Sequence, residues 1–114
     1  MGEHTKIRIL KVKIREQSVL ARIAAWKLHS GKMAITLGST IYLQNTCRGQ
    51  FLSNKSWLRH ELEHVRQFQK YGLLKFIFMY LLESIRKGYR NNKWEVAARA
   101  AENRADQDSE IEFV

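Results

Sequence analysis

The sequence predicts a mostly helical α+β domain that contains a small antiparallel β-sheet. Hydrophobic and charged residues alternate over residues 5–15, which is typical of a strand. Hydrophobic residues recur every three or four positions over residues 54–71, which indicates an amphipathic helix, and residues 73–87 form a second, very apolar helical segment. A length of 114 residues favours one domain, which we assign to residues 1–105, followed by an acidic tail at 106–114.

The elements before the motif helix are expected to alternate between strand and helix. After the first strand, Ser18 is expected to cap a helix that ends at Gly31. Residues 33–43 predict a second extended segment. Gly38 and Ser39 lie in its middle and indicate a tight turn, so a hairpin is the alternative to one long strand. Residues 44–53 have the composition of a loop.

The second half of the chain is expected to hold three helices. The helix over residues 54–71 should be central, the helix over 73–87 should be largely buried in the core, and a last helix should cover about 93–104. The expected boundary residues are Ser53 or Asn54 and Gly72 for the first of these helices, Gly88 after the second, and Asn91 or Asn92 before the third.

The chain is strongly basic, with a formal net charge of +9. Residues 1–105 contain all 20 Lys and Arg side chains and only 7 acidic ones. Such a charge could attract nucleic acid, an anionic membrane or an acidic protein, or could simply keep a small domain solvated. No recognised nucleic-acid-binding motif is present, so nucleic acid as a partner has no motif to support it.

The sequence gives simple expectations about compartment. The single cysteine, Cys47, excludes an internal disulfide, and we expect it to be a small buried or half-buried thiol. No signal peptide is visible at the N-terminus. The longest apolar run, residues 73–82, is too short to form a transmembrane segment. These features lead us to expect a cytoplasmic protein of undetermined oligomeric state.

The sharpest chemical signal is a His-Glu-x-x-His motif at residues 60–64. On a helix, positions i and i+4 differ by roughly 40° and one turn of rise, so His60 and His64 would point the same way. Their imidazoles could then bind one zinc ion, which accepts histidine nitrogen in a tetrahedral shell. Glu61 would lie beside this ion and could reach a water molecule on it.

A catalytic zinc site needs a third protein ligand and an open position. The remaining histidines, His4 and His29, lie upstream of the motif, so a downstream carboxylate is the better source. Glu95, near the start of the last helix, is the first candidate, and small residues around it would allow close helix packing. Glu83 and Glu102 remain the alternatives.

The motif, followed by a helix that carries Glu95, resembles the gluzincin metallopeptidases, above all their smallest members, the minigluzincins. It is also similar to a bacterial domain of unknown function that reads His-Glu-Leu-x-His-Val-x-Gln after a segment Ala-x-Thr-x-Gly-x-x-Ile. The resemblance covers roughly residues 33–104. The matching positions are Ala34, Thr36, Gly38 and Ile41, and then His60, Glu61, Leu62, His64, Val65 and Gln67.

This resemblance implies a zincin-like minimal domain that hydrolyses peptide bonds in a peptide or protein substrate. It assigns His60, His64 and Glu95 as zinc ligands and Glu61 as the general base that acts on a zinc-activated water. A strand within residues 33–43 could bind the substrate by strand addition. The candidate transition-state stabilisers are Tyr89, Tyr80 and Arg99, and the candidate partner of a ligand histidine is Glu83 or Glu102.

A second class of function is compatible with the same residues. The chain could be a non-catalytic, basic zinc-binding module that binds nucleic acid or an acidic protein partner. Metal-dependent cleavage of peptides would favour the enzyme, whereas steeply salt-dependent binding to DNA or RNA would favour the binding module.

Overall fold

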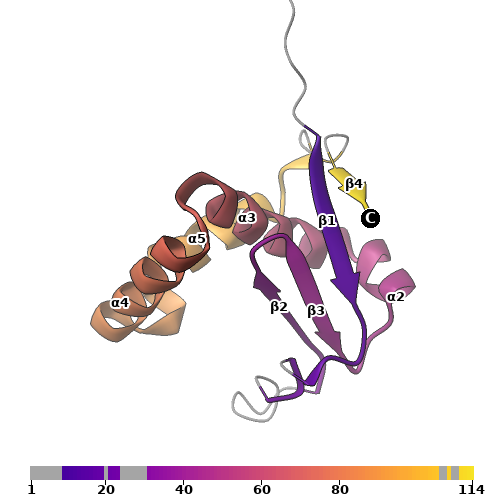
Figure 1. The fold of residues 1–114 in the computed structure, drawn as a ribbon, viewed down its shortest axis with the longest axis horizontal. Coiled ribbons are helices and arrows are strands. Elements are labelled where there is room, and N and C mark those ends of the chain that lie inside the picture. Colours follow the sequence, from indigo (N-terminus) through magenta and orange to yellow (C-terminus); the bar gives the residue numbers. More distant parts are fainter. Residues whose placement is uncertain (1–8, 20, 24–30, 106–107, 109–110) are drawn as a thin grey trace, which may run out of the picture.

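The computed structural model describes residues 9–19, 21–23, 31–105, 108 and 111–114. It is an α+β domain in which helices pack against a four-stranded sheet (Figure 1), so the predicted fold class is confirmed. The elements are β1 (Leu10–Arg15), β2 (Met33–Leu37), β3 (Thr40–Gln44), α2 (Arg48–Ser53), α3 (Lys55–Tyr71), α4 (Leu73–Asn91), α5 (Lys93–Ala101) and β4 (Ile111–Phe113).

The sheet is mixed, which corrects the expectation of an antiparallel one. Its strand order is β2-β3-β1-β4, and β2 and β3 are antiparallel whereas β1 is parallel to both β3 and β4. β2 is antiparallel to β1 in direction but does not pair with it. β3 lies between them, and because it is antiparallel to β2 it runs in the same direction as β1. β2 is therefore left at the edge of the sheet.

The hairpin predicted within residues 33–43 is confirmed. Leu37 pairs with Thr40, so Gly38 and Ser39 form a two-residue connection. Gly38 has a φ of 66°. A positive φ at the first residue of such a connection suits glycine and matches the right-handed twist of the flanking strands.

The loop predicted for residues 44–53 is wrong in its second half, which forms helix α2. The Cys47 sulfur caps this helix by accepting a hydrogen bond from the Gln50 N–H at 3.4 Å. The thiol is exposed, which also corrects the expectation of a buried or half-buried cysteine. Cysteine is not one of the usual capping residues, so the sequence carried no start signal for this helix.

The core lies between the sheet and the helices α2 and α3. Side chains alternate along β1, with Leu10 and Val12 buried and Lys11 and Lys13 exposed. Asn54 caps the start of α3, where its side chain accepts the Trp57 N–H, and Gly72 caps the end, as predicted. The buried apolar residues of this core are Leu10, Val12, Ile41, Leu43, Phe51, Leu58, Leu62 and Val65.

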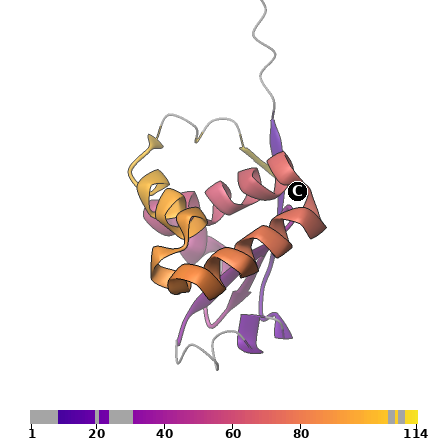
Figure 2. The same ribbon diagram turned by 90° about the vertical axis from the view of Figure 1, so that its left-hand side faces the viewer.

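The prediction that residues 73–87 are largely buried is wrong. Only Phe76 and Glu83 of α4 are buried, whereas Leu74 is 79% and Ile85 is 81% exposed. Figure 2 shows α4 crossing in front of α3 and the sheet, at the outside of the molecule. Its regular helix stops at Gly88 as predicted, where φ is 78°.

Asn92 joins α4 to α5. It is fully buried, its Oδ1 accepts the Trp94 N–H at 2.8 Å, and its Nδ2 donates to the Ser84 hydroxyl at 2.8 Å and to the Tyr80 carbonyl at 3.1 Å. Of the two predicted caps, Asn92 is therefore the one that the structure uses. α5 ends at Ala101, three residues before the predicted end.

The segment after α5 contributes a strand that the sequence did not predict. Leu10 pairs with Ile111 and Val12 with Phe113, so β4 extends the sheet beyond β1. Upstream of the hairpin, the Ser18 hydroxyl accepts the Ala21 N–H at 3.3 Å, as expected of a helix cap. Most of the predicted helix that follows, and residues 5–8 of the first predicted strand, lie outside the described residues.

Within the described part of the chain, no helix combines the length and apolar character that crossing a membrane requires.

We expect Asn92→Ala to lower the free energy of unfolding by about 1–3 kcal/mol, because it removes a cap and leaves buried backbone and hydroxyl groups without their partner. Denaturant titration measures this change. Asn91→Ala, at the exposed neighbouring position, is the matched control and should change stability by less than about 0.5 kcal/mol. Equal losses in the two variants would contradict the role of Asn92.

Candidate metal centre

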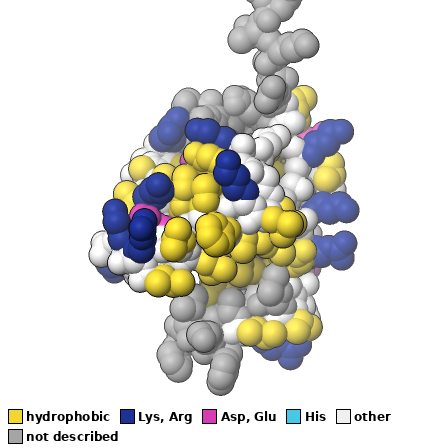
Figure 3. Space-filling model, turned by 60° about the vertical axis from the view of Figure 1, so that its left-hand side comes forward, with side chains coloured by type: hydrophobic (Ala, Val, Ile, Leu, Met, Phe, Trp, Pro, Cys, Tyr) yellow, Lys and Arg dark blue, Asp and Glu magenta, His cyan; other side chains and the backbone are white. Residues whose placement is uncertain are grey.

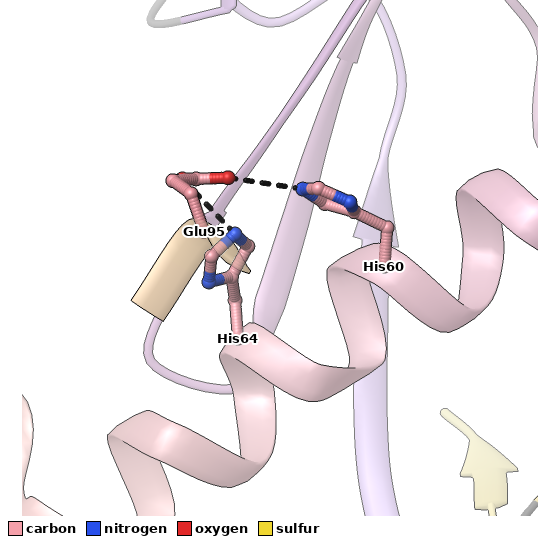
Figure 4. A group of neighbouring side chains, drawn as sticks. All are labelled: His60, His64 and Glu95. Atoms are coloured by element: carbon pink, nitrogen blue, oxygen red, sulfur yellow. Dashed lines mark hydrogen bonds and ion pairs between the residues drawn. The ribbon is translucent and has the colours of Figure 1, made fainter. Parts of the chain in front are cut away.

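The motif helix and α5 bring three metal-binding side chains together. His60 and His64 lie one turn apart on α3, and Glu95 in the first turn of α5 faces both rings (Figure 4). The His60 Nε2 is 3.1 Å from one Glu95 carboxylate oxygen, and the His64 Nε2 is 3.2 Å from the other. One ligand atom from each residue lies within 4.8 Å of the other two, so the cluster could hold a metal ion.

The rings are held so that both Nε2 atoms face Glu95. The His60 Nδ1 lies 2.8 Å from the Glu102 carboxylate. The His64 Nδ1 lies 2.9 Å from Gln67 Oε1, and the Gln67 amide nitrogen donates to the Trp94 carbonyl at 3.1 Å. Because that donation fixes which way the Gln67 amide points, the His64 Nδ1 is the hydrogen-bond donor. Each Nε2 is thereby left for the cluster.

Of the two carboxylates predicted as partners of a ligand histidine, only Glu102 occupies that position. Glu83 instead accepts the Lys93 N–H at 3.2 Å and pairs with Lys87 at 3.8 Å, so it stabilises the start of α5. The helix break at Gly88 turns the chain back, and Glu83 consequently meets the N-terminus of α5 and not the motif helix.

Glu61 lies beside the cluster but is held by a different partner. Its carboxylate accepts a hydrogen bond of 2.7 Å from the Thr36 hydroxyl on β2. The side chain is buried, and burial raises its pKa above the usual range, although the neighbouring histidines and Thr36 oppose this rise. A buried carboxylate with a raised pKa is suited to accept a proton near neutral pH.

The three candidate transition-state stabilisers occupy different places. The Tyr80 hydroxyl donates to Glu95, so it holds a cluster residue. Tyr89 lines the cavity next to His60 and Glu61, and burial, followed by the charge of Glu95, raises its pKa to about 12. Arg99 is exposed, and its guanidinium donates to the Arg90 carbonyl at the end of α4, so the structure does not bring it to the cluster.

The cluster opens into a groove that follows β2. One part, with a volume of about 390 Å³, lies between the whole of β2 and the α4 side chains Phe76, Ile77 and Leu81. An adjoining part of about 410 Å³ is more polar and is bordered by Lys32, Asn54 and Glu102. The two parts share Met33, Ala34, His60, Glu61 and Tyr89. His60 and Glu61 therefore lie where the two parts of the groove meet, and His64 and Glu95 line the first part.

The charges of the cluster compensate one another. Burial alone would lower the pKa of His60, but hydrogen bonds with Glu95 and Glu102 outweigh it and raise this pKa to about 9. The pKa of His64 is raised for a similar reason. Burial would raise the pKa of Glu95, yet the hydrogen bonds from His60 and His64 bring it well below its usual range. The metal-free cluster thus holds protons where a cation would bind.

The structure gives Thr36, Gln67 and Tyr80 roles in the site that were not assigned to them from the sequence. Gln67 was noted only as a matching position of the motif, although its spacing of three from His64 places it on the same helix face. Tyr80 was considered for the oxyanion and not as a support for Glu95. The other two histidines, His4 and His29, lie outside the described residues.

Metal affinity should increase with pH, because a metal ion must displace the proton that His60 holds up to a pKa of about 9. Below that pKa, we expect the apparent dissociation constant to fall about tenfold per pH unit for each displaced proton. Calorimetric titration with Zn²⁺ in buffers of different ionisation enthalpy at pH 6, 7 and 8 counts the protons released. An affinity that does not change with pH would contradict this assignment of the histidine protons.

Glu102→Ala should weaken metal binding by about 10–100-fold, because the His60 ring loses the acceptor that orients it. Glu102→Gln keeps an oxygen that can accept this hydrogen bond, so it should lose less metal affinity. Competition with a chelating indicator measures both constants. Glu63→Ala is the control, since Glu63 lies on the same helix and pairs with Arg66 at 4.0 Å. A Glu102→Ala protein with the affinity of wild type would show that Glu102 does not support the site.

Comparison with known proteins places this arrangement in a family. The family model described as the eCIS core domain, the core of extracellular contractile injection systems, matches residues 1–72. The match includes the hairpin and α3 with His60, Glu61 and His64, and it ends before α4 and α5. Comparisons with curated proteins and with solved structures give no match. Since the family model covers more than half of the chain, this protein belongs to the eCIS core domain family.

Proposed function

We propose that this chain is a zinc-dependent metallopeptidase of the gluzincin type, in which His60, His64 and Glu95 bind zinc and Glu61 is the general base. The proposal is supported by two carboxylates, Glu95 and Glu61, that occupy different positions in the site. Glu95 faces both histidine Nε2 atoms, whereas Glu61 lies beside them, bound by Thr36. A site that only held a metal would have no need of the second carboxylate.

The donor set fits zinc. Two histidine nitrogens and one carboxylate are the ligands of a catalytic zinc site that keeps a fourth position open. With bonds of about 2.0–2.2 Å, adjacent ligands of a tetrahedral ion lie roughly 3.3 Å apart. The nitrogen–oxygen separations of 3.1 and 3.2 Å, each to a different oxygen of Glu95, are close to that value, and one ligand atom from each of the three residues lies within 4.8 Å of the others. Zinc bound there would polarise the scissile carbonyl and lower the pKa of a coordinated water molecule.

Glu61 supplies the proton transfers. Its carboxylate lines the groove, and the Thr36 hydrogen bond fixes the orientation of one oxygen. Glu61 takes a proton from the attacking water and later passes it to the nitrogen of the leaving amine. The raised pKa of the buried carboxylate allows it to hold this proton between the two transfers.

The groove supports a peptide as the substrate. β2 is an edge strand of the sheet, and all five of its residues line the groove beside the cluster. An extended peptide can add to such an edge through main-chain hydrogen bonds. The groove continues past the cluster in both directions along β2, so that residues on both sides of a scissile bond would have a place to bind.

Tyr89 is the best placed of the candidate oxyanion donors. Tyr80 already donates to Glu95, whereas Arg99 donates to the Arg90 carbonyl and is not among the residues that line the groove. Tyr89 borders both parts of the groove, and with a pKa of about 12 its hydroxyl keeps its proton at neutral pH. A protonated hydroxyl at that position can donate to the negative charge that develops on the carbonyl oxygen.

Glu61→Gln should separate the enzyme from a zinc-binding module. The amide keeps an oxygen that can accept the Thr36 hydrogen bond but cannot act as a base, so zinc content should persist while peptide cleavage falls by about two to four orders of magnitude. Metal analysis and cleavage of a peptide library measure the two properties. His64→Ala should lose both, and Glu63→Gln, outside the groove, should lose neither.

Two outcomes would count against the proposed peptidase. Unchanged cleavage by Glu61→Gln would show that another base or a contaminant is responsible. Wild-type protein that binds zinc but cleaves no peptide in a diverse library would favour the non-catalytic zinc-binding module.

A further inference from the structure

The outer face of α4 is apolar although its side chains are exposed in the described part of the structure, and Leu81 at the edge of this face borders the groove. Phe76 and Glu83 are the buried residues of this helix. Phe78 is 68%, Leu81 is 55% and Leu82 is 41% exposed, in addition to Leu74 and Ile85. Figure 3 shows hydrophobic side chains gathered on this side of the molecule, with Lys and Arg side chains around them.

These residues form one stripe, which we call the outer stripe and define as Leu74, Phe78, Leu81, Leu82 and Ile85. They recur at spacings of three and four, so at about 100° per residue they fall within roughly 100° of the helix circumference. Phe76 and Glu83 lie on the opposite side of the helix. The stripe is therefore a second apolar face, and the packing of α4 against the described residues leaves it largely exposed.

A basic margin follows the stripe. Lys75 and Arg86 are exposed and lie on the side of the helix next to Phe78 and Leu82. Glu83 is the one acidic residue of α4 and it is buried. Its carboxylate pairs with Lys87 and accepts a hydrogen bond from the Lys93 N–H at the start of α5. The outer stripe therefore has positive charge beside it and no acidic side chain of its own helix near it.

The charge argues against a second copy of this chain as the partner that covers the stripe. Two copies of this chain would bring their basic margins together, in addition to the repulsion between two chains of net charge +9. An anionic lipid surface matches both features, because apolar side chains enter the boundary of the acyl chains while Lys and Arg meet the headgroup phosphates.

We propose that the outer stripe of α4 docks this protein on anionic lipid membranes. Leu74, Phe78 and Ile85, the most exposed residues of the stripe, enter the interface. Lys75 and Arg86 contact lipid phosphates. The helix lies in the plane of the membrane surface and does not cross it, in keeping with its length and composition.

Co-sedimentation with vesicles tests this docking. We expect the full chain to bind vesicles of equal parts phosphatidylglycerol and phosphatidylcholine, and to bind pure phosphatidylcholine far more weakly. Phe78→Ser together with Ile85→Ser should weaken binding about a hundredfold, since each buried side chain contributes about tenfold or more. Lys75→Gln with Arg86→Gln should weaken it by roughly fivefold per charge.

Ile9→Ser is the matched control, because Ile9 is 58% exposed but lies outside α4, and it should bind vesicles like wild type. Circular dichroism verifies that each variant is folded. Failure of wild type to bind the anionic vesicles would overturn the proposal. So would binding that is unchanged in the Phe78 and Ile85 variant, or a dimer in sedimentation velocity that this variant abolishes, which would assign the stripe to a second copy.

Discussion

The structure depends on one buried carboxylate. Glu95 is only 3% exposed, and a charge at that depth is stable only when it is paired. Both of its oxygens face a histidine of α3, and the Tyr80 hydroxyl of α4 donates to it as well. The partners of Glu95 thus come from two other helices, so its pairing fixes α5 against α3 and α4. The same contacts therefore determine both the geometry of the site and the packing of these helices.

The two histidines that pair with Glu95 are themselves held by further hydrogen bonds. Each motif histidine has two ring nitrogens, and the protein holds the Nδ1 atoms through Glu102 and Gln67. Gln67 in turn bonds to the Trp94 carbonyl next to Glu95, while Arg59 donates to the Glu102 carbonyl at 3.2 Å and pairs with Asp108 at 2.8 Å. The rings are consequently oriented by groups of α5 and of the segment that follows it. The match to the family model ends at residue 72, so these supporting groups lie beyond it, except Gln67 and Arg59.

The sequence predicted the parts of the fold that local patterns encode. The boundaries of α3 follow from Asn54 and Gly72, and the hairpin follows from Gly38, because each feature is set by neighbouring residues. The parallel pairing of β1 could not be predicted in this way, since it depends on which strand inserts between β1 and β2. The burial of α4 was misjudged for a related reason: apolar composition does not tell whether the second face of a helix meets protein or solvent. Within the site, the motif brought out His60, Glu61 and His64, whereas the supporting roles of Gln67 and Tyr80 required the packing of α4 and α5.

The contacts that hold α4 in place lie on its inner face, and this bears on its outer stripe. Its inner face is attached through Phe76, through Tyr80 on Glu95 and through Glu83 at the start of α5. Leu74, Phe78 and Ile85 take no part in these contacts, so replacing them by polar residues would remove little that stabilises the fold. Exposed apolar side chains in a continuous stripe are unfavourable in water and promote association. Residues that do not stabilise the chain they belong to, and that are costly to expose, are best explained by a surface outside the chain that covers them.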